Sequence, residues 1–273
     1  MKRMFALFLA LSFLTSCEDV IEVDVPSEEP RLIVDALMRI DTTVTTAPFF
    51  AEVKVSASSD FFGEISPVRL DEITITNTKL NESIVLLETQ PGSGLYRKDT
   101  SIEFLTSAEL LLQMNYRGSI FQASTTYVPT VPIDKVEQGD GTLFSGEETE
   151  IVVTFTDSPN RDDFYLFDFD FNEYLVTEDT FYPGQTFQFS YFYEEGIESG
   201  REIDVSIIGV DKPFYNYMNQ IIVQSGGNQG PFTTPAATVR GNIINVTDVD
   251  NIDSFALGYF AVCQVFKKSV TIE

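Results

Sequence analysis

The chain has 273 residues and a formal net charge of −25, from 42 acidic and 17 basic side chains. It contains no histidine, so the commonest general base and the commonest metal ligand are missing from the whole sequence. A strongly negative field repels nucleic acid and anionic lipid headgroups. The composition therefore argues against a nucleic-acid-binding protein and against most classes of enzyme. We expect no cofactor and no metal ion.

The N-terminus has the pattern of a lipoprotein signal. Two basic residues precede an apolar run over residues 4–13, which is about half the ~20 residues that a membrane-spanning helix needs. The run ends in Leu-Thr-Ser-Cys at 14–17, which resembles the bacterial lipobox, where the cysteine is acylated and the peptide before it is removed. We therefore predict a signal peptide at 1–16 and an acyl anchor on Cys17, rather than a secretory signal that merely ends near a cysteine.

Residues 17–30 are predicted to form an acidic tether. Removal of residues 1–16 leaves 15 basic against 42 acidic side chains, a net charge of −27, and one cysteine besides the anchor, so no disulfide can form. Glu18 and Asp19 directly follow Cys17, and this resembles the signal that sends Bacteroidota lipoproteins to the outer face of the outer membrane. An ordinary solvated linker is the alternative, and the apolar–acidic alternation over 21–25 also fits a first strand.

Two β-domains are predicted after the tether. Residues 31–130 contain short alternating segments separated by turns, which favours an N-terminal β-sandwich. The clearest hairpin pairs Leu110–Tyr116 with residues 120–126 across Arg117-Gly118. Two prolines mark a boundary near residue 130, and 131–273 is predicted to be a C-terminal β-rich domain. The fold class is all-β, with two sandwiches that are immunoglobulin-like or jelly-roll-like.

One helix is predicted near 213–224, in the C-terminal domain. Asp211 is placed to cap it and Pro213 to occupy its first turn. The stripe of Phe214, Met218 and residues 221–222 has helical spacing and is expected to face the core.

Several segments together resemble a known family. They are Pro30–Asp35, Gly94–Tyr96, Tyr116–Thr125, Pro213–Tyr217, Gly230–Phe232, Arg240–Ile243 and Leu257–Phe260. They are similar to the Bacteroidota lipoproteins catalogued as domain of unknown function 4249, whose members often lie beside TonB-dependent receptors. The resemblance implies the fold, a surface location and a receptor as partner, but no catalytic residues.

Three patterns suggest chemistry, and each has a simpler interpretation. Asp248–Asp253 is similar to a calcium loop but breaks the EF-hand pattern, so a polar turn is favoured. Asp168 and Asp170 have the spacing of a glycosidase acid/base pair, yet neighbouring acids on a strand are usually a solvated face. Cys263 lies in an apolar run and is expected to be a buried, unreactive thiol.

The aromatic strands raise the question of a glycan platform. Tyr165, Phe167, Phe169 and Phe171 share one strand face, which is usually core, and the chain has no tryptophan. Glycan binding therefore stays the alternative function, with a hydrolase using paired carboxylates third.

The preferred function is a non-enzymatic, surface-exposed outer-membrane lipoprotein that acts as an accessory or capping subunit of a TonB-dependent receptor in nutrient uptake. The helix and the loop after it are the candidate docking surface. The residues expected to contact the partner are Tyr215, Asn219, Gln229 and Phe232. The alternative is that the helix only closes an end of the sandwich.

Overall fold

The computed structural model describes residues 29–44, 48–60, 63–143, 146–194, 196–225, 237–251 and 253–273. Within these residues the chain is mostly strand, in a ten-stranded, a five-stranded and a three-stranded sheet. The predicted all-β class is confirmed. Cys17, Gln229 and Phe232, which we expected to carry the anchor and part of the docking surface, lie outside the described residues.

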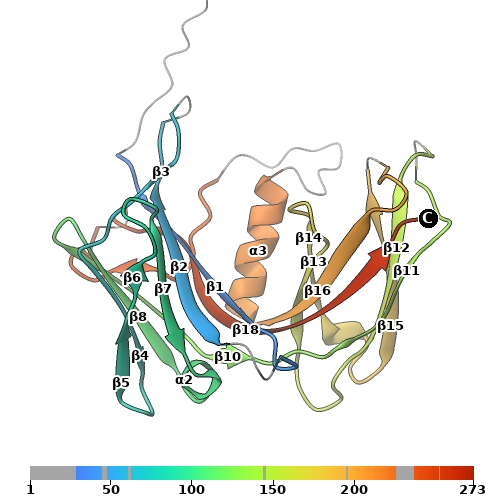
Figure 1. The fold of residues 1–273 in the computed structure, drawn as a ribbon, viewed down its shortest axis with the longest axis horizontal. Coiled ribbons are helices and arrows are strands. Elements are labelled where there is room, and N and C mark those ends of the chain that lie inside the picture. Colours follow the sequence, from blue (N-terminus) through green and yellow to red (C-terminus); the bar gives the residue numbers. More distant parts are fainter. Residues whose placement is uncertain are drawn as a thin grey trace, which may run out of the picture.

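The first sandwich packs part of the ten-stranded sheet against the five-stranded sheet (Figure 1). On the ten-stranded side are β1 (Leu32–Ile40), β2 (Phe49–Ala57), β3 (Ser66–Pro67), β6 (Leu87–Glu88) and β7 (Leu95–Thr100). Opposite them are β4 (Glu72–Asn77), β5 (Glu82–Val85), β8 (Leu110–Tyr116), β9 (Ser119–Thr125) and β17 (Ile244–Asn245). Alternate residues of β1 are buried, because successive side chains of a strand point to opposite faces. The hairpin predicted at 110–126 is β8 and β9.

The second sandwich packs the other part of the ten-stranded sheet against the three-stranded sheet. Its strands are β11 (Ile133–Gln138), β12 (Thr149–Thr156), β13 (Phe164–Asp168), β14 (Tyr174–Glu178), β15 (Thr186–Tyr193), β16 (Glu202–Val210) and β18 (Leu257–Thr271). Tyr165, Phe167 and Phe169 are fully buried in its core, as the alternation indicates. Phe171 does not share that core face. It is 40% exposed in a turn where Asp170, Phe171 and Asn172 all have positive φ.

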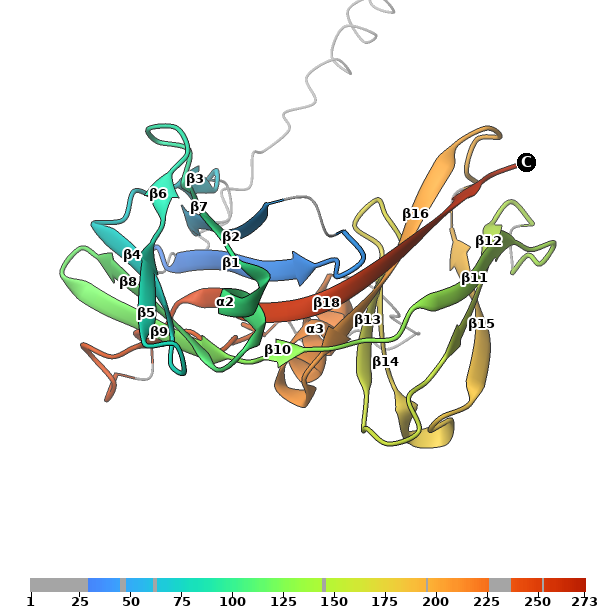
Figure 2. The same ribbon diagram turned by 60° about the horizontal axis from the view of Figure 1, so that its bottom comes forward.

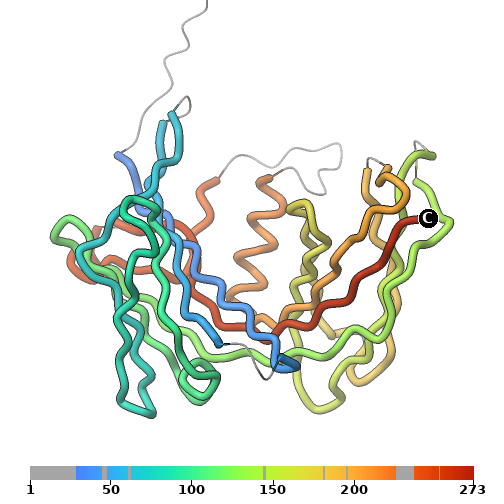
Figure 3. The backbone as a smooth tube through the Cα atoms, viewed as in Figure 1, coloured from blue at the N-terminus to red at the C-terminus, as the bar shows by residue number. Residues whose placement is uncertain are grey.

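Strand β18 belongs to both sandwiches. Residues 257–264 pair with β1 in parallel, and residues 265–271 pair with β16 antiparallel. The short β10 (Tyr127–Val128) also pairs with β18. The tube in Figure 3 shows two arms that rise from this shared strand and give the molecule a U shape, and Figure 2 shows β18 running from one arm into the other.

The shared strand changes how the two domains are composed. Ile243, Ala256, Phe260 and Val262 come from the C-terminal segment, yet they lie in the core of the first sandwich. The segment 31–130 therefore does not complete the first sandwich without strands from beyond residue 240. The chain leaves the first sandwich near residue 130 and returns to it through β17 and β18.

Helix α3 (Lys212–Gln224) agrees with the helix predicted near 213–224. It stands between the arms (Figure 1). The Asp211 side chain accepts a hydrogen bond from Phe214 N, so the predicted cap is confirmed. The predicted core stripe is only partly correct, because Phe214 is buried whereas residues 218, 221 and 222 are half-buried. The helix contacts the sheet mainly through its first two turns. α2 (Ile102–Thr106) and the 3₁₀ turn η2 (Asp179–Phe181) are the other helical elements described, and no described helix is long and apolar enough to cross a membrane.

Two glycines allow the backbone to cross itself where β18 enters the first sandwich. Gly258 has φ +97°, and a Cβ there would lie 1.9 Å from the carbonyl oxygen of Val34 on β1. A Cβ on Gly241 would lie 1.6 Å from the carbonyl oxygen of Gly258. Asn242 fixes the same crossing, because its amide exchanges hydrogen bonds with the Phe260 backbone at 2.8 and 2.9 Å. Only glycine fits at these two positions.

We predict that Gly258→Ala strongly destabilises the protein. The new methyl group clashes with the β1 backbone and the residue must keep a positive φ, so we expect a loss above about 4 kcal/mol in urea unfolding. Gly118→Ala is the matched control. Gly118 has φ +80° in the β8–β9 turn with nothing within 4 Å of a Cβ, so its cost should be only about 1–2 kcal/mol. Equal losses for the two variants would contradict this role of Gly258.

Candidate functional site

One hollow lies at a gap in the ten-stranded sheet. β1 and β2 pair only from Leu32/Ala57 to Asp35/Lys54, because β1 then follows β18 while β2 follows β7. The strands separate and leave a hollow of about 600 Å³, which we call the strand gap. Arg39, Lys54 and Arg97 line it together with acidic and apolar side chains.

Both arginines in the strand gap have partners. The Arg97 guanidinium lies 3.2 Å from the centroid of the Phe50 ring and 3.7 Å from a carboxylate oxygen of Glu52. Arg39 Nη1 lies 2.6 Å from Asp168 Oδ2, so this pair joins β1 of the first sandwich to β13 of the second. Both pairs are partly exposed and each contributes little to stability. The strand gap offers mixed charges and aromatic surface rather than a single dominant charge.

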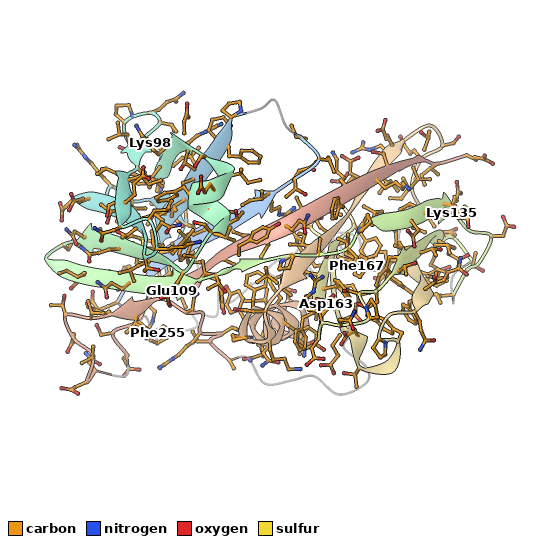
Figure 4. All side chains as sticks on the ribbon, turned by 90° about the horizontal axis from the view of Figure 1, so that it is seen from below. Lys98, Glu109, Lys135, Asp163, Phe167 and Phe255 are labelled. Atoms are coloured by element: carbon orange, nitrogen blue, oxygen red, sulfur yellow. The ribbon has the colours of Figure 1, made fainter. Side chains whose placement is uncertain are left out.

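A second hollow of about 410 Å³ surrounds Phe255, and we call it the Phe255 hollow. The guanidinium groups of Arg31 and Arg240 lie 4.2 and 3.9 Å from the centroid of the Phe255 ring. Arg31 also donates a hydrogen bond to the carbonyl oxygen of Asp253. These contacts bring together Arg31, which follows the tether, and the segment 240–256. Figure 4 shows Phe255 far from Asp163 and Phe167 of the second sandwich.

The described residues of Asp248–Asp253, the segment similar in sequence to a calcium loop, make the contacts of a turn. Asn251 Nδ2 donates to Asp248 Oδ2 at 3.0 Å, and Asp253 N donates to Asn251 Oδ1 at 3.1 Å. The first bond joins two side chains and the second joins a side chain to the backbone, as in a polar turn. Among the described residues, no group of three or more acidic or cysteine side chains is arranged to hold a metal ion.

Asp168 and Asp170 are not aimed at a common point. Asp168 Oδ2 accepts from Arg39, and its Oδ1 accepts from the Asp170 backbone N–H at 3.1 Å. Asp170 Oδ1 in turn accepts from Phe171 N. Both carboxylates thus close the β13–β14 turn, an arrangement that holds the backbone rather than a substrate. The absence of catalytic residues stays a prediction.

Cys263 lies beneath α3 and is 1% exposed, as expected for an unreactive thiol. Burial raises its pKa, and the nearby carboxylate of Asp211 raises it further. The thiol is therefore protonated at neutral pH and packs as a small apolar side chain.

The structure describes Tyr215 and Asn219, two of the four residues expected at the docking surface. Asn219 is exposed, but Tyr215 is half-buried with its ring 5.4 Å from Phe164. Lys212 Nζ lies 4.7 Å from the Tyr215 ring and 2.7 Å from Glu178. Tyr215 thus packs the start of α3 against Phe164 of β13 and helps to attach the helix to the sheet. It is a poor choice for an interface variant that must leave stability unchanged.

Sequence reasoning missed a buried acidic cluster in the second sandwich. Asp157, Asp163 and Asp179 are each under 8% exposed. The hydroxyl of Tyr165 donates to Asp157 and, at 3.0 Å, to Asp163, while Arg161 forms a two-point ion pair with Asp163. Burial is the largest of several causes that raise the pKa of Tyr165. The three acids are up to 22 residues apart in the chain, so no local pattern announces the cluster.

The cluster positions turns rather than forming an open site. Asp157 Oδ2 accepts from Gly184 N at 2.7 Å, and Asp179 Oδ2 accepts from Asp163 N at 2.9 Å. Buried carboxylates that accept backbone N–H bonds replace the hydrogen bonds that the turns would otherwise make with water. The cluster fixes the loops that connect β12 to β13 and β14 to β15.

We predict that Asp179→Asn stabilises the protein near neutral pH. Burial raises the pKa of the Asp179 carboxyl, so its protonated form is favoured in the folded state. The stability that the protonated Asp179 carboxyl contributes is fully present below the pKa of this group in the unfolded chain. It is lost as pH rises through the raised pKa of the group in the folded state. Asparagine is neutral at every pH and keeps an oxygen for Asp163 N. The melting temperature of the variant should exceed that of the wild type near pH 7, and the difference should vanish at about pH 3. A difference that does not change with pH would contradict the prediction.

Comparisons with known proteins define the relationship of the chain. No curated protein matches it. A chain from the solved structure "Structural insight into host cell surface retention of a 1.5-MDa bacterial ice-binding adhesin" is similar at 10% identity, with a TM-score of 0.20. The match covers 90% of this chain and 64% of that one, so the chain spans less than two thirds of the adhesin chain, and no structural argument follows from so low a score. The family described as Domain of unknown function (DUF4249) matches residues 18–269. The chain therefore belongs to the DUF4249 family.

Proposed function

We propose that the protein is a surface-exposed outer-membrane lipoprotein and a non-enzymatic accessory or capping subunit of a TonB-dependent receptor in nutrient uptake. The observation that carries the proposal is the segment Leu14–Asp19, in which a lipobox-like motif is followed directly by two acids. An acylated cysteine anchors a protein to a membrane, since each buried methylene contributes about 0.8 kcal/mol. The receptor was inferred from a resemblance to the DUF4249 family. Membership of the chain in that family therefore supports the proposal.

The tether sets how far the β-body can lie from the anchor. A flexible segment of the length of residues 18–30 has a root-mean-square reach of roughly 20 Å. The described residues begin at Glu29, and the Arg31 guanidinium lies against the Phe255 ring. The net charge of −27 opposes adhesion to an anionic surface. We expect the body to stay near the membrane without lying on it, where a membrane-embedded partner can reach it.

Helix α3 is the element that we assign to receptor contact. It stands between the two arms, and Asn216, Asn219 and Gln220 are exposed on it. A helix held by its first two turns presents the rest of its surface to a partner. The proposal keeps Asn219 as a contact residue and moves Tyr215 to the support of the helix.

The second candidate function is binding of a glycan or another substrate by the lipoprotein alone. The observation that favours it is the half-buried state of Phe187, Phe189 and Tyr191 on β15, since aromatic rings stack on sugar rings. A glycan array with the purified protein separates the two functions. Binding of a defined glycan in the absence of any receptor would favour the second candidate.

We predict that Cys17→Ala releases the protein from the membrane. The variant lacks the acylation site, and the apolar run over 4–13 is too short to span a bilayer. The protein should move from the membrane fraction to the soluble fraction, or stay in the cell with its signal peptide uncut. Fractionation and intact-mass measurement check both points. A variant that is processed and membrane-bound like the wild type would show that Cys17 is not the anchor.

We predict that Asn219→Arg weakens receptor binding without lowering stability. The wild type should co-purify from detergent extracts with a large β-barrel protein, and the variant should retain about tenfold less of it, which corresponds to about 1.4 kcal/mol. Gln90→Arg is the control, because Gln90 is also exposed but lies in the β6–β7 turn of the first sandwich. Wild-type protein that never co-purifies with a barrel contradicts the receptor proposal. Equal retention by both variants moves the interface away from α3.

A further inference from the structure

β15 is the outermost strand of the three-stranded sheet, whose order is β11, β12, β15. It has eight residues, Thr-Phe-Gln-Phe-Ser-Tyr-Phe-Tyr, with no charge and no proline. Natural proteins usually protect a long edge with charges, prolines, bulges or a covering element, because its free backbone groups pair with other strands. β15 carries none of these protections in its own sequence.

The ladder shows which backbone groups of β15 point outward. Asp157 N donates to Gln185 O at 3.0 Å, and these residues lie directly opposite each other in the β12–β15 register. In an antiparallel pair, hydrogen-bonded and non-hydrogen-bonded positions alternate. The backbone N–H and C=O groups of Phe187, Phe189 and Tyr191 therefore form hydrogen bonds with β12. The N–H and C=O groups of the residues between them point away from β12.

A bond on the other side of β12 gives the same phase. Gly139 N donates to Glu150 O at 3.0 Å, in line with the β11–β12 register. The backbone N–H and C=O groups of the even-numbered residues of β12 therefore point to β11, and those of the odd-numbered residues point to β15. The outward groups of β15 thus belong to Thr186, Gln188, Ser190 and Phe192. Within the part of the chain that the structure describes, no hydrogen-bond partner is found for these backbone groups.

The other sheet edges in the described residues are protected. β5, β6 and β17 have four residues or fewer. β14 lies against α3. β11 contains Asp134, Lys135 and Glu137, and the Lys268 side chain donates to the carbonyl oxygen of Asp134 at 2.6 Å. The unprotected edge of β15 is thus an exception to the rule that the rest of this fold follows.

An apolar surface lies beside this edge. Phe187, Phe189 and Tyr191 are half-buried, and each has its ring against a deeper ring of the second sandwich. Phe187 stacks on Tyr182 with centroids 4.3 Å apart, and Tyr191 stacks on Phe169 at 3.9 Å. A strand added to β15 would bury more of these rings with its own alternate side chains.

We propose that β15 binds an extended segment of a partner protein by strand addition, in which main-chain bonds give affinity and alternate side chains give specificity. The segment has apolar residues at every second position and is neutral or basic. Glu194 directly follows the strand, and Glu173 accepts a bond from the Tyr191 hydroxyl at 2.6 Å beside it. The proposal does not depend on the receptor, which is assigned to α3.

A second copy of the chain is a poorer occupant. Pairing of β15 with its own copy would bring the acidic residues beside both edges together, on bodies that each carry a net charge of −27. Such repulsion opposes association of like chains, whereas a neutral or basic segment is not repelled.

The test is amide hydrogen exchange on the purified mature protein in detergent, with a synthetic peptide as probe. The probe has the sequence of β12, Thr149–Thr156, with blocked ends and with Glu150→Gln so that it is neutral, because that sequence already pairs antiparallel with β15 and places Ile151, Val153 and Phe155 opposite its aromatic residues. In dilute protein the amides of Gln188 and Ser190 should exchange at least about a hundredfold faster than those of Phe187 and Phe189. Addition of the peptide should slow the exchange of Gln188 and Ser190 by about tenfold or more.

Two variants and one control peptide make the test specific. Gln188→Pro removes an outward N–H and leaves the bonds to β12 intact, so the peptide should no longer protect Ser190. Thr154→Ala is the matched control, because it loses the same 3.2 Å contact between Gln188 Nε2 and Thr154 Oγ1 but keeps the edge. A β12 peptide with prolines at two positions should give no protection, which tests the edge even if Gln188→Pro fails to fold.

Three results would overturn the proposal. Slow exchange of Gln188 and Ser190 in dilute protein without peptide would mean that the chain covers its own edge. Protection that increases with protein concentration would make a second copy the occupant. Unchanged exchange at about 1 mM peptide, where even binding of about −4 kcal/mol would be detected, would mean that the edge does not accept a strand.

Discussion

The fold depends on the two pairings of one strand. The first half of β18 forms a parallel ladder with β1, and its second half forms an antiparallel ladder with β16. The first pairing joins segments more than 220 residues apart, so it closes a loop that contains most of the described chain. Neither sandwich is complete until the last residues of the chain are in place. The Arg39–Asp168 pair then joins the sandwiches a second time at the same junction.

The shared strand also determines where the surface is open. Because β1 follows β18 away from β2, the sheet splits and the strand gap forms between the two. The Phe255 hollow lies beside Arg240 and Gly241, next to the crossing of Gly241 and Gly258. In the three-stranded sheet β11 contacts β18, and β15 at the other end of the sheet has one edge without a described strand beside it. The two surfaces that we propose for partners, on α3 and at the edge of β15, belong to different elements.

Local patterns in the sequence predicted the elements, but not how they combine. The turn at Arg117-Gly118 identified the β8–β9 hairpin, and Asp211 with Pro213 identified the start of α3, because these signals lie within a few residues. The pairing of residue 33 with residue 257 has no local signal. The predicted burial of the apolar stripe of α3 was only partly correct, because the helix packs against the sheet mainly through its first two turns. Periodicity in the sequence does not indicate how much of such a stripe is covered. Phe171 departs from its strand because three residues adopt positive φ in the turn.

Unfolding of the mature protein, followed by calorimetry, tests most directly whether β18 makes the two sandwiches one unit. The account predicts a single transition whose calorimetric and van't Hoff enthalpies agree, because loss of β18 from either sandwich opens the other. Two separable transitions, or a calorimetric enthalpy about twice the van't Hoff value, would contradict it. In that case the sandwiches would fold independently despite the strand they share.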